Sequence, residues 1–140
     1  MILRDSIYSE ETICNELSSM FGGKAWKWDG RFGCVLIEFP VDAQDSIRTV
    51  LERYLDTVWN ISNIDTAPDA VQTINDHLGG LMAGQLLFTS DPGRDDLMYC
   101  AWWPWGNGET VSIRVAPVYG KLTEPQRAER INLFKDRFGV

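Results

Sequence analysis

Residues 85–115, QLLFTSDPGRDDLMYCAWWPWGNGETVSIRV, decide the fold of this chain. Within them, residues 85–89, 97–103 and 109–115 are rich in aliphatic, aromatic and β-branched side chains, which favour strands. The two segments between these runs are rich in Asp, Gly, Pro and Asn. Such segments form tight turns, because Gly and Asn tolerate positive φ and Pro fixes φ. The pattern predicts an antiparallel meander of three strands.

A second group of strands precedes the meander. Residues 24–28 and 32–39 flank the dipeptide Asp29-Gly30, and Asp-Gly readily supplies the positive φ values of a tight hairpin turn. The run CVLIEF, which starts at Cys34, is apolar almost throughout, as in a strand covered on both faces. We therefore predict a hairpin whose second strand is central in its sheet.

Helical periodicity surrounds these strands. Ser9 is expected to cap a first helix that ends at Gly22-Gly23, and Asp42 a second whose apolar face runs from Ile47 to Val58. Residues 57–64 either extend this second helix or form a short strand, and their β-branched and aromatic side chains favour the strand.

Two more helices complete the prediction. The third starts at Thr66-Ala-Pro-Asp69 and ends at Gly79-Gly80. For the last helix, Thr123 and Gln126 form a capping box, and its apolar face is expected to pack on the sheet. No linker or repeat interrupts the 140 residues. The sequence therefore predicts a single α+β domain over residues 1–140, with an antiparallel sheet of about five or six strands and three or four helices.

The charge of the chain is acidic and unevenly distributed. The net charge is −7, and residues 32–112 contain only three basic side chains against twelve acidic ones. Such a field repels nucleic acid and anionic lipid, and it attracts basic proteins. No signal-peptide core or membrane-span pattern is apparent, so we expect a cytoplasmic protein without membrane association.

The residues that commonly carry catalysis or metal binding are sparse. His77 is the sole histidine, and the cysteines Cys14, Cys34 and Cys100 form no C-x-x-C pair, so we expect a surface histidine and reduced, buried thiols. No phosphate-binding or dinucleotide-binding glycine motif is present. We therefore predict no catalytic, cofactor or metal residues and no enzyme activity, although acidic side chains scattered in the sequence could still converge in the fold.

The feature that favours binding is the tryptophan-rich stretch that ends the second meander strand. Strand alternation places Trp102 and Trp103 on opposite faces of the sheet, so one face or the following turn is expected to expose a ring. Together with the acids of the two turns, these rings form the predicted partner-binding set: Asp91, Asp95, Asp96, Trp103, Trp105 and Glu109.

Size, acidity and the order of helix, hairpin and helix between Thr66 and Gly139 resemble those of immunity proteins of polymorphic bacterial toxin systems, including the contact-dependent inhibition and Rhs types. This resemblance implies an acidic protein that neutralises a basic cognate toxin domain by occluding its active site. The opening order of helix, strands and helix is also similar to that of type III secretion chaperones, which are usually dimers. The sequence leaves the oligomeric state open.

Overall fold

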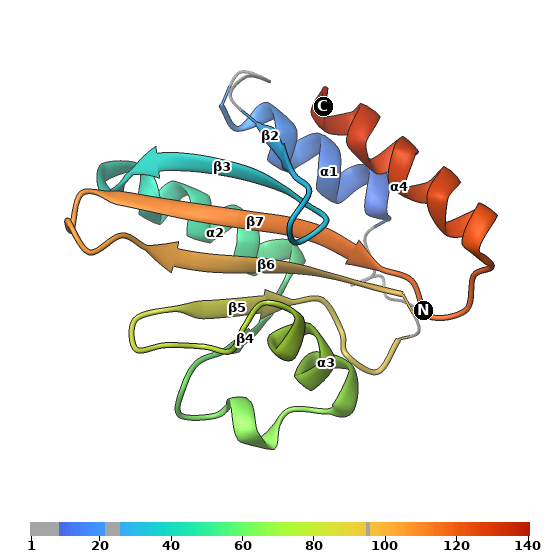
Figure 1. Ribbon diagram of the computed structural model, residues 1–140. Helices are drawn as coiled ribbons and strands as arrows, with labels where there is room; N and C mark the ends of the chain where they lie inside the picture. Colours follow the sequence, from blue (N-terminus) through green and yellow to red (C-terminus); the bar gives the residue numbers. More distant parts are fainter. Residues whose placement is uncertain (1–8, 22–25, 95) are drawn as a thin grey trace, which may run out of the picture.

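The computed structural model describes residues 9–21, 26–94 and 96–140, and its elements are labelled in Figure 1. Six strands form one antiparallel sheet in the order β2-β3-β7-β6-β5-β4, packed with four α-helices. In chain order the elements are α1 (Glu10–Ser19), β2 (Lys27–Asp29), β3 (Cys34–Pro40), η1 (Val41–Ala43), α2 (Gln44–Tyr54), β4 (Thr57–Trp59), η2 (Ile64–Thr66), α3 (Asp69–His77), β5 (Leu86–Thr89), β6 (Leu97–Pro104), β7 (Thr110–Val118) and α4 (Glu124–Phe138). The predicted α+β class is confirmed.

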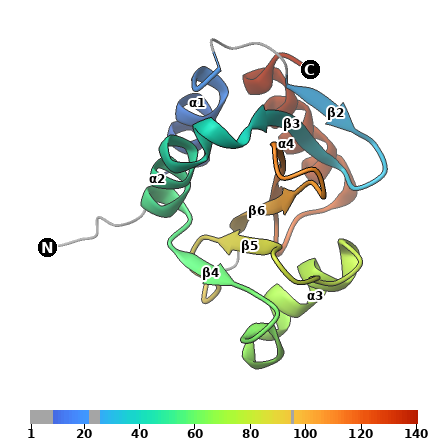
Figure 2. The same cartoon turned by 90° about the vertical axis from the view of Figure 1, so that its left-hand side faces the viewer.

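The helices cover the two faces of the sheet unequally. On one face α1, α2 and α4 pack over a core that includes Leu17, Leu51 and Phe134. On the other face α3 packs Val71 and Ile74 over β5 and β6, and Figure 2 shows α2 and α3 on opposite sides of the sheet.

The meander forms as predicted, and its register determines which face of the sheet Trp102 and Trp103 each occupy. Trp102 pairs with Ile113 and Trp103 pairs with Ser112 across the β6–β7 ladder. Trp102 is buried in the core under α1, α2 and α4, whereas Trp103 packs against the core on the α3 side. The expected alternation is therefore confirmed.

The turn between β2 and β3 is longer than predicted. Asp29 pairs with Cys34, so the four residues 30–33 connect the strands instead of the three residues 29–31 that the predicted strand bounds leave. The Asp29 carboxylate accepts a hydrogen bond from the Arg31 amide at 3.0 Å, and Gly33 takes the positive φ of 69°. The positive φ thus falls on the last loop residue, which the dipeptide pattern did not indicate. Lys24 and Ala25 lie outside the described residues.

The second helix begins and ends differently from the prediction. Asp42 lies in η1 instead of capping α2, and the N-cap residue, Ala43, makes no side-chain capping bond. The helix ends at Leu55, whose φ of −122° and ψ of 76° leave the helical region. Val58 therefore belongs to β4, where it pairs with Phe88. Of the two alternatives for residues 57–64, helix extension or strand, the structure has a strand at their start, β4.

The last strand also runs further than the predicted residues 109–115, and it includes Pro117. The β6–β7 ladder continues to the pair Leu97 and Val118, whereas the β3–β7 ladder stops at Val115. Beyond Val115 one side of β7 therefore has no paired strand among the described residues. A proline, which lacks an N–H, is tolerated on such a side.

The predicted last helix, α4, is confirmed together with its capping box. Thr123 and Gln126 form both hydrogen bonds of the capping box. Phe134 and Phe138 are buried against the sheet, and Ile131 is half-buried. α4 is thus part of the main core.

Candidate partner-binding surface

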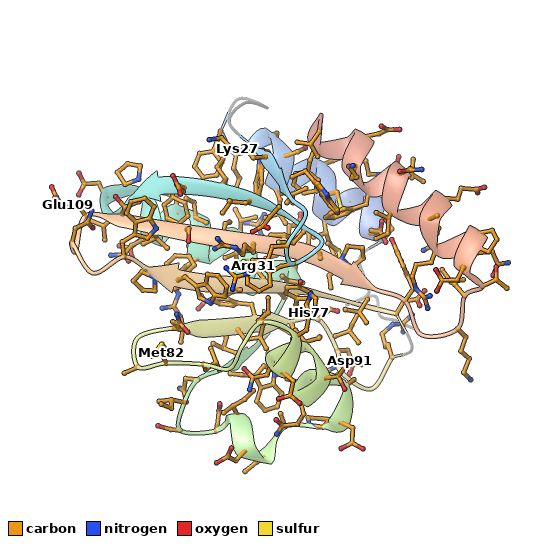
Figure 3. The ribbon with its side chains drawn as sticks, viewed as in Figure 1. Lys27, Arg31, His77, Met82, Asp91 and Glu109 are labelled. Carbon is orange, nitrogen blue, oxygen red and sulfur yellow. The ribbon has the colours of Figure 1, made fainter. Side chains whose placement is uncertain are left out.

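The fold divides the predicted binding residues among three places. Asp91 and Asp96 lie in the β5–β6 turn, and Trp105 and Glu109 lie in the β6–β7 turn at the other end of β6. Figure 3 shows the labelled Asp91 and Glu109 far apart along the sheet. Trp103 lies on the strand between them, and Asp95 lies outside the described residues.

The β6–β7 turn is held by its own hydrogen bonds. The Trp105 amide donates to the Thr110 carbonyl at 2.8 Å, and the Gly108 amide donates to the Trp105 carbonyl at 3.2 Å. Asn107 Oδ1 accepts from the amides of Glu109 and Thr110 at 2.8 and 3.2 Å. These bonds present Trp105, which is 43% exposed, and Glu109 from an ordered backbone.

Two further apolar side chains are exposed at this end of the sheet. Ile61 follows β4 and is 54% exposed, and Met82 precedes β5 and is 69% exposed. The β4–β5 and β5–β6 registers bring both loops to the end where the β6–β7 turn lies, and Figure 2 shows these loops facing the viewer together. Sequence reasoning missed both residues, because an isolated apolar residue in a loop gives no periodic signal.

Two exposed carboxylates lie at the same end of the sheet, at the β6–β7 turn. The Val41 amide donates to the Glu109 carbonyl at 2.8 Å, which holds η1, and with it Asp42, against the β6–β7 turn. Asp42 and Glu109 are exposed and form no ion pair with any described residue. We call Ile61, Met82, Trp105, Asp42 and Glu109 the hairpin-end surface.

Trp103 has a different environment from Trp105. The Arg114 guanidinium lies 4.2 Å from the centre of the Trp103 ring, and the Phe32 ring meets Trp103 edge-on at 5.7 Å. Arg114 also pairs with Asp29 at 3.1 Å and donates to Ser112 Oγ at 3.2 Å. This stack covers part of the sheet face beside α3 and leaves Trp103 half-buried.

The acids of the β5–β6 turn border a cavity of about 500 Å³ at the opposite end of the sheet. On its wall, Tyr119 donates a hydrogen bond to Glu10 at 2.6 Å, and Glu10 also pairs with Arg137 at 3.2 Å. Burial, followed by the bond to Glu10, raises the pKa of the Tyr119 hydroxyl. Glu10 therefore ties α1 to β7 and α4 beside this cavity.

The histidine is hydrogen-bonded and the cysteines are buried. His77 is exposed, as predicted, and its Nε2 lies 2.7 Å from the Phe32 carbonyl oxygen. The three cysteines are buried, as predicted, and burial raises the pKa of the Cys14 and Cys34 thiols from 9.0 to about 12. No group of three or more potential metal ligands occurs in the described ranges.

Comparisons of the chain with protein-family models, with curated proteins and with solved structures found no match. Within the part of the chain that the structure describes, no helix has both the length and the apolar character needed to cross a membrane.

Proposed function

We propose that this protein is a non-catalytic binding module that docks on a basic protein domain through the hairpin-end surface. The observation that carries the proposal is the exposure of Ile61, Met82 and Trp105 at one end of the sheet. Tryptophan is enriched among residues that dominate binding energy.

The charge pattern supports a basic partner. Most of the described arginines are engaged in ion pairs within the chain: Arg48, Arg53, Arg114, Arg127, Arg130 and Arg137. Asp42 and Glu109 on the hairpin-end surface form no ion pair within the part of the chain that the structure describes. Free carboxylates around an apolar centre accelerate association with a cationic surface and favour the correct orientation.

The specific function that we propose is that of an immunity protein, which neutralises a cognate toxin domain by occluding its active site. A basic cleft that binds an anionic substrate such as nucleic acid is complementary to a rim of carboxylates around a tryptophan. The state of the nucleophilic side chains supports a non-catalytic role. The cysteines are buried with raised thiol pKa values, and His77 is hydrogen-bonded to a backbone carbonyl.

The test is capture of the partner from the native host, followed by binding kinetics at two salt concentrations. Trp105→Ala is expected to increase the dissociation rate about 30-fold, because a desolvated ring at an interface centre contributes about 2 kcal/mol. Glu109→Lys is expected to slow association, and the effect is expected to shrink at high salt. Cytoplasmic location is tested by fractionation of the same host.

Matched controls separate this surface from general effects of charge and hydrophobicity. Leu133→Ala removes an exposed apolar side chain from α4, and Glu129→Lys reverses an exposed charge on the same helix. Both variants are expected to bind like the original protein. An acidic partner, or equal effects of Trp105→Ala and Leu133→Ala, would contradict the proposal. A dimer that captures an extended secretion substrate would instead identify an effector chaperone.

A further inference from the structure

The cavity at the far end of the sheet is formed by elements that are distant in sequence. The N-terminal end of α1, the C-terminal end of α2, the β5–β6 turn, the end of β7 and α4 surround it. Its volume of about 500 Å³ lies within the range of about 300–1,000 Å³ found for small-molecule sites. Ile13, Leu97 and Met98 also border the cavity, and each is only 4% exposed.

Several hydrogen-bond donors on the cavity wall are already used within the protein. The Tyr119 and Tyr54 hydroxyls donate to Glu10 and Glu16, respectively, at 2.6 and 3.2 Å. Two of the three lining arginines are also engaged. Arg53 pairs with Glu16 at 3.3 Å, and Arg130 lies 3.9 Å from Glu10 and 4.5 Å from the centre of the Tyr119 ring.

The lining groups that remain available are mainly acceptors. Asp56, Asp91 and Asp96 are exposed at the cavity and form no ion pair with any described residue. Of the three lining arginines, only Arg94 is likewise exposed without an ion pair to any described residue. Asp91 and Asp96 each use one oxygen to accept a backbone amide, from Gly93 at 2.9 Å and from Gly120 at 3.3 Å. A carboxylate has about four lone-pair sites, so each retains capacity for another donor.

We propose that this cavity binds a small organic cation, an ammonium or guanidinium group on an aliphatic stem. Such a ligand supplies the N–H donors that the free carboxylates lack. The site lies at the opposite end of the sheet from the hairpin-end surface, and the proposal does not depend on a protein partner.

The test is calorimetric titration of the purified protein with spermidine and with agmatine, and with glutarate as an anionic probe of similar stem length. Ligands of this size reach dissociation constants on the order of millimolar. We expect both cations to bind with that affinity, and glutarate to show no measurable binding. In amide spectra of isotope-labelled protein, the cations are expected to shift Leu97 and Met98.

Charge-neutral variants locate the site. Asp91→Asn keeps the side-chain oxygen that accepts the Gly93 amide, so the turn is expected to stay folded while a charge is lost. It is expected to weaken spermidine binding about threefold, and the double variant Asp56→Asn/Asp91→Asn about tenfold. Asp69→Asn, on α3 and outside the cavity lining, removes the same charge and is expected to have no effect. Equal weakening by Asp69→Asn, or binding of glutarate as tight as that of spermidine, would overturn the proposal.

Discussion

Replacing Phe134 by alanine measures how strongly α4 holds the domain together. The Phe134 side chain is fully buried, and its ring centre lies 5.0 Å from that of Phe138, which in turn lies 4.8 Å from Trp26. Deleting a buried phenylalanine costs about 3–5 kcal/mol, which includes the cavity left behind. Because whole domains are stable by only about 5–15 kcal/mol, Phe134→Ala is expected to lower the melting temperature by about 12 °C.

The adjacent residue supplies the control. Leu133 is on the same helix but is 45% exposed, so Leu133→Ala removes little buried area and is expected to cost less than about 1 kcal/mol. Urea unfolding followed by circular dichroism, with tryptophan fluorescence as a second probe, measures both variants. Phe134→Leu provides a milder change, should Phe134→Ala fail to fold. Equal losses of unfolding free energy for the variants at positions 133 and 134 would refute the packing of α4 described above.

Two further predictions concern the buried thiols and the Arg114 stack. The folded-state pKa of Cys14 and Cys34, about 12, exceeds the ordinary thiol value of 9.0, so each thiol's contribution to the unfolding free energy is complete below pH 9 and is lost between pH 9 and 12. A Cys14→Ala variant is therefore expected to lose less unfolding free energy than the original protein between pH 8 and 10.5, by up to about 1.4 kcal/mol per pH unit above 9. Identical slopes of unfolding free energy against pH for the two proteins would contradict this. Arg114→Ala is expected to lower the free energy of urea unfolding by about 3 kcal/mol, because it leaves the largely buried Asp29 carboxylate without its ion-pair partner. Arg127→Ala breaks an exposed ion pair and is expected to cost less than about 1 kcal/mol. Equal costs for the two variants would show that the buried pair stabilises the fold no more than the exposed one.

The sequence predicted the elements whose signals are local. The Ser9 cap of α1, the capping box of α4 and the alternation of Trp102 and Trp103 each depend on residues a few positions apart, and the structure contains them all. The sequence left alternatives open where two local signals competed. Val58 continues the helical periodicity of α2, but the β-branched and aromatic residues around it favoured a strand, and pairing with β5 places it in one.

The contacts that build the two surfaces could not be predicted from local patterns. Glu10 is joined to Tyr119 and Arg137 across more than one hundred positions, and Arg114 reaches Asp29 across eighty-five. These pairings depend on β7 lying between β3 and β6, a choice of strand order that hairpin signals alone do not determine. The exposure of Ile61 and Met82 likewise follows from how the loops meet at the sheet end.

The strand order also decides how the acidic residues act. β6 has eight residues and rises about 3.3 Å per residue, so roughly 26 Å separates the turns at its two ends. The Debye length at physiological salt is about 8 Å, so charges in one turn are largely screened from a partner docked at the other. Asp91 and Asp96 therefore contribute little to association at the hairpin-end surface, although they belong to the same acidic stretch of sequence. The two ends of the sheet are expected to respond independently, with Glu109→Lys altering partner association and Asp91→Asn altering cation binding.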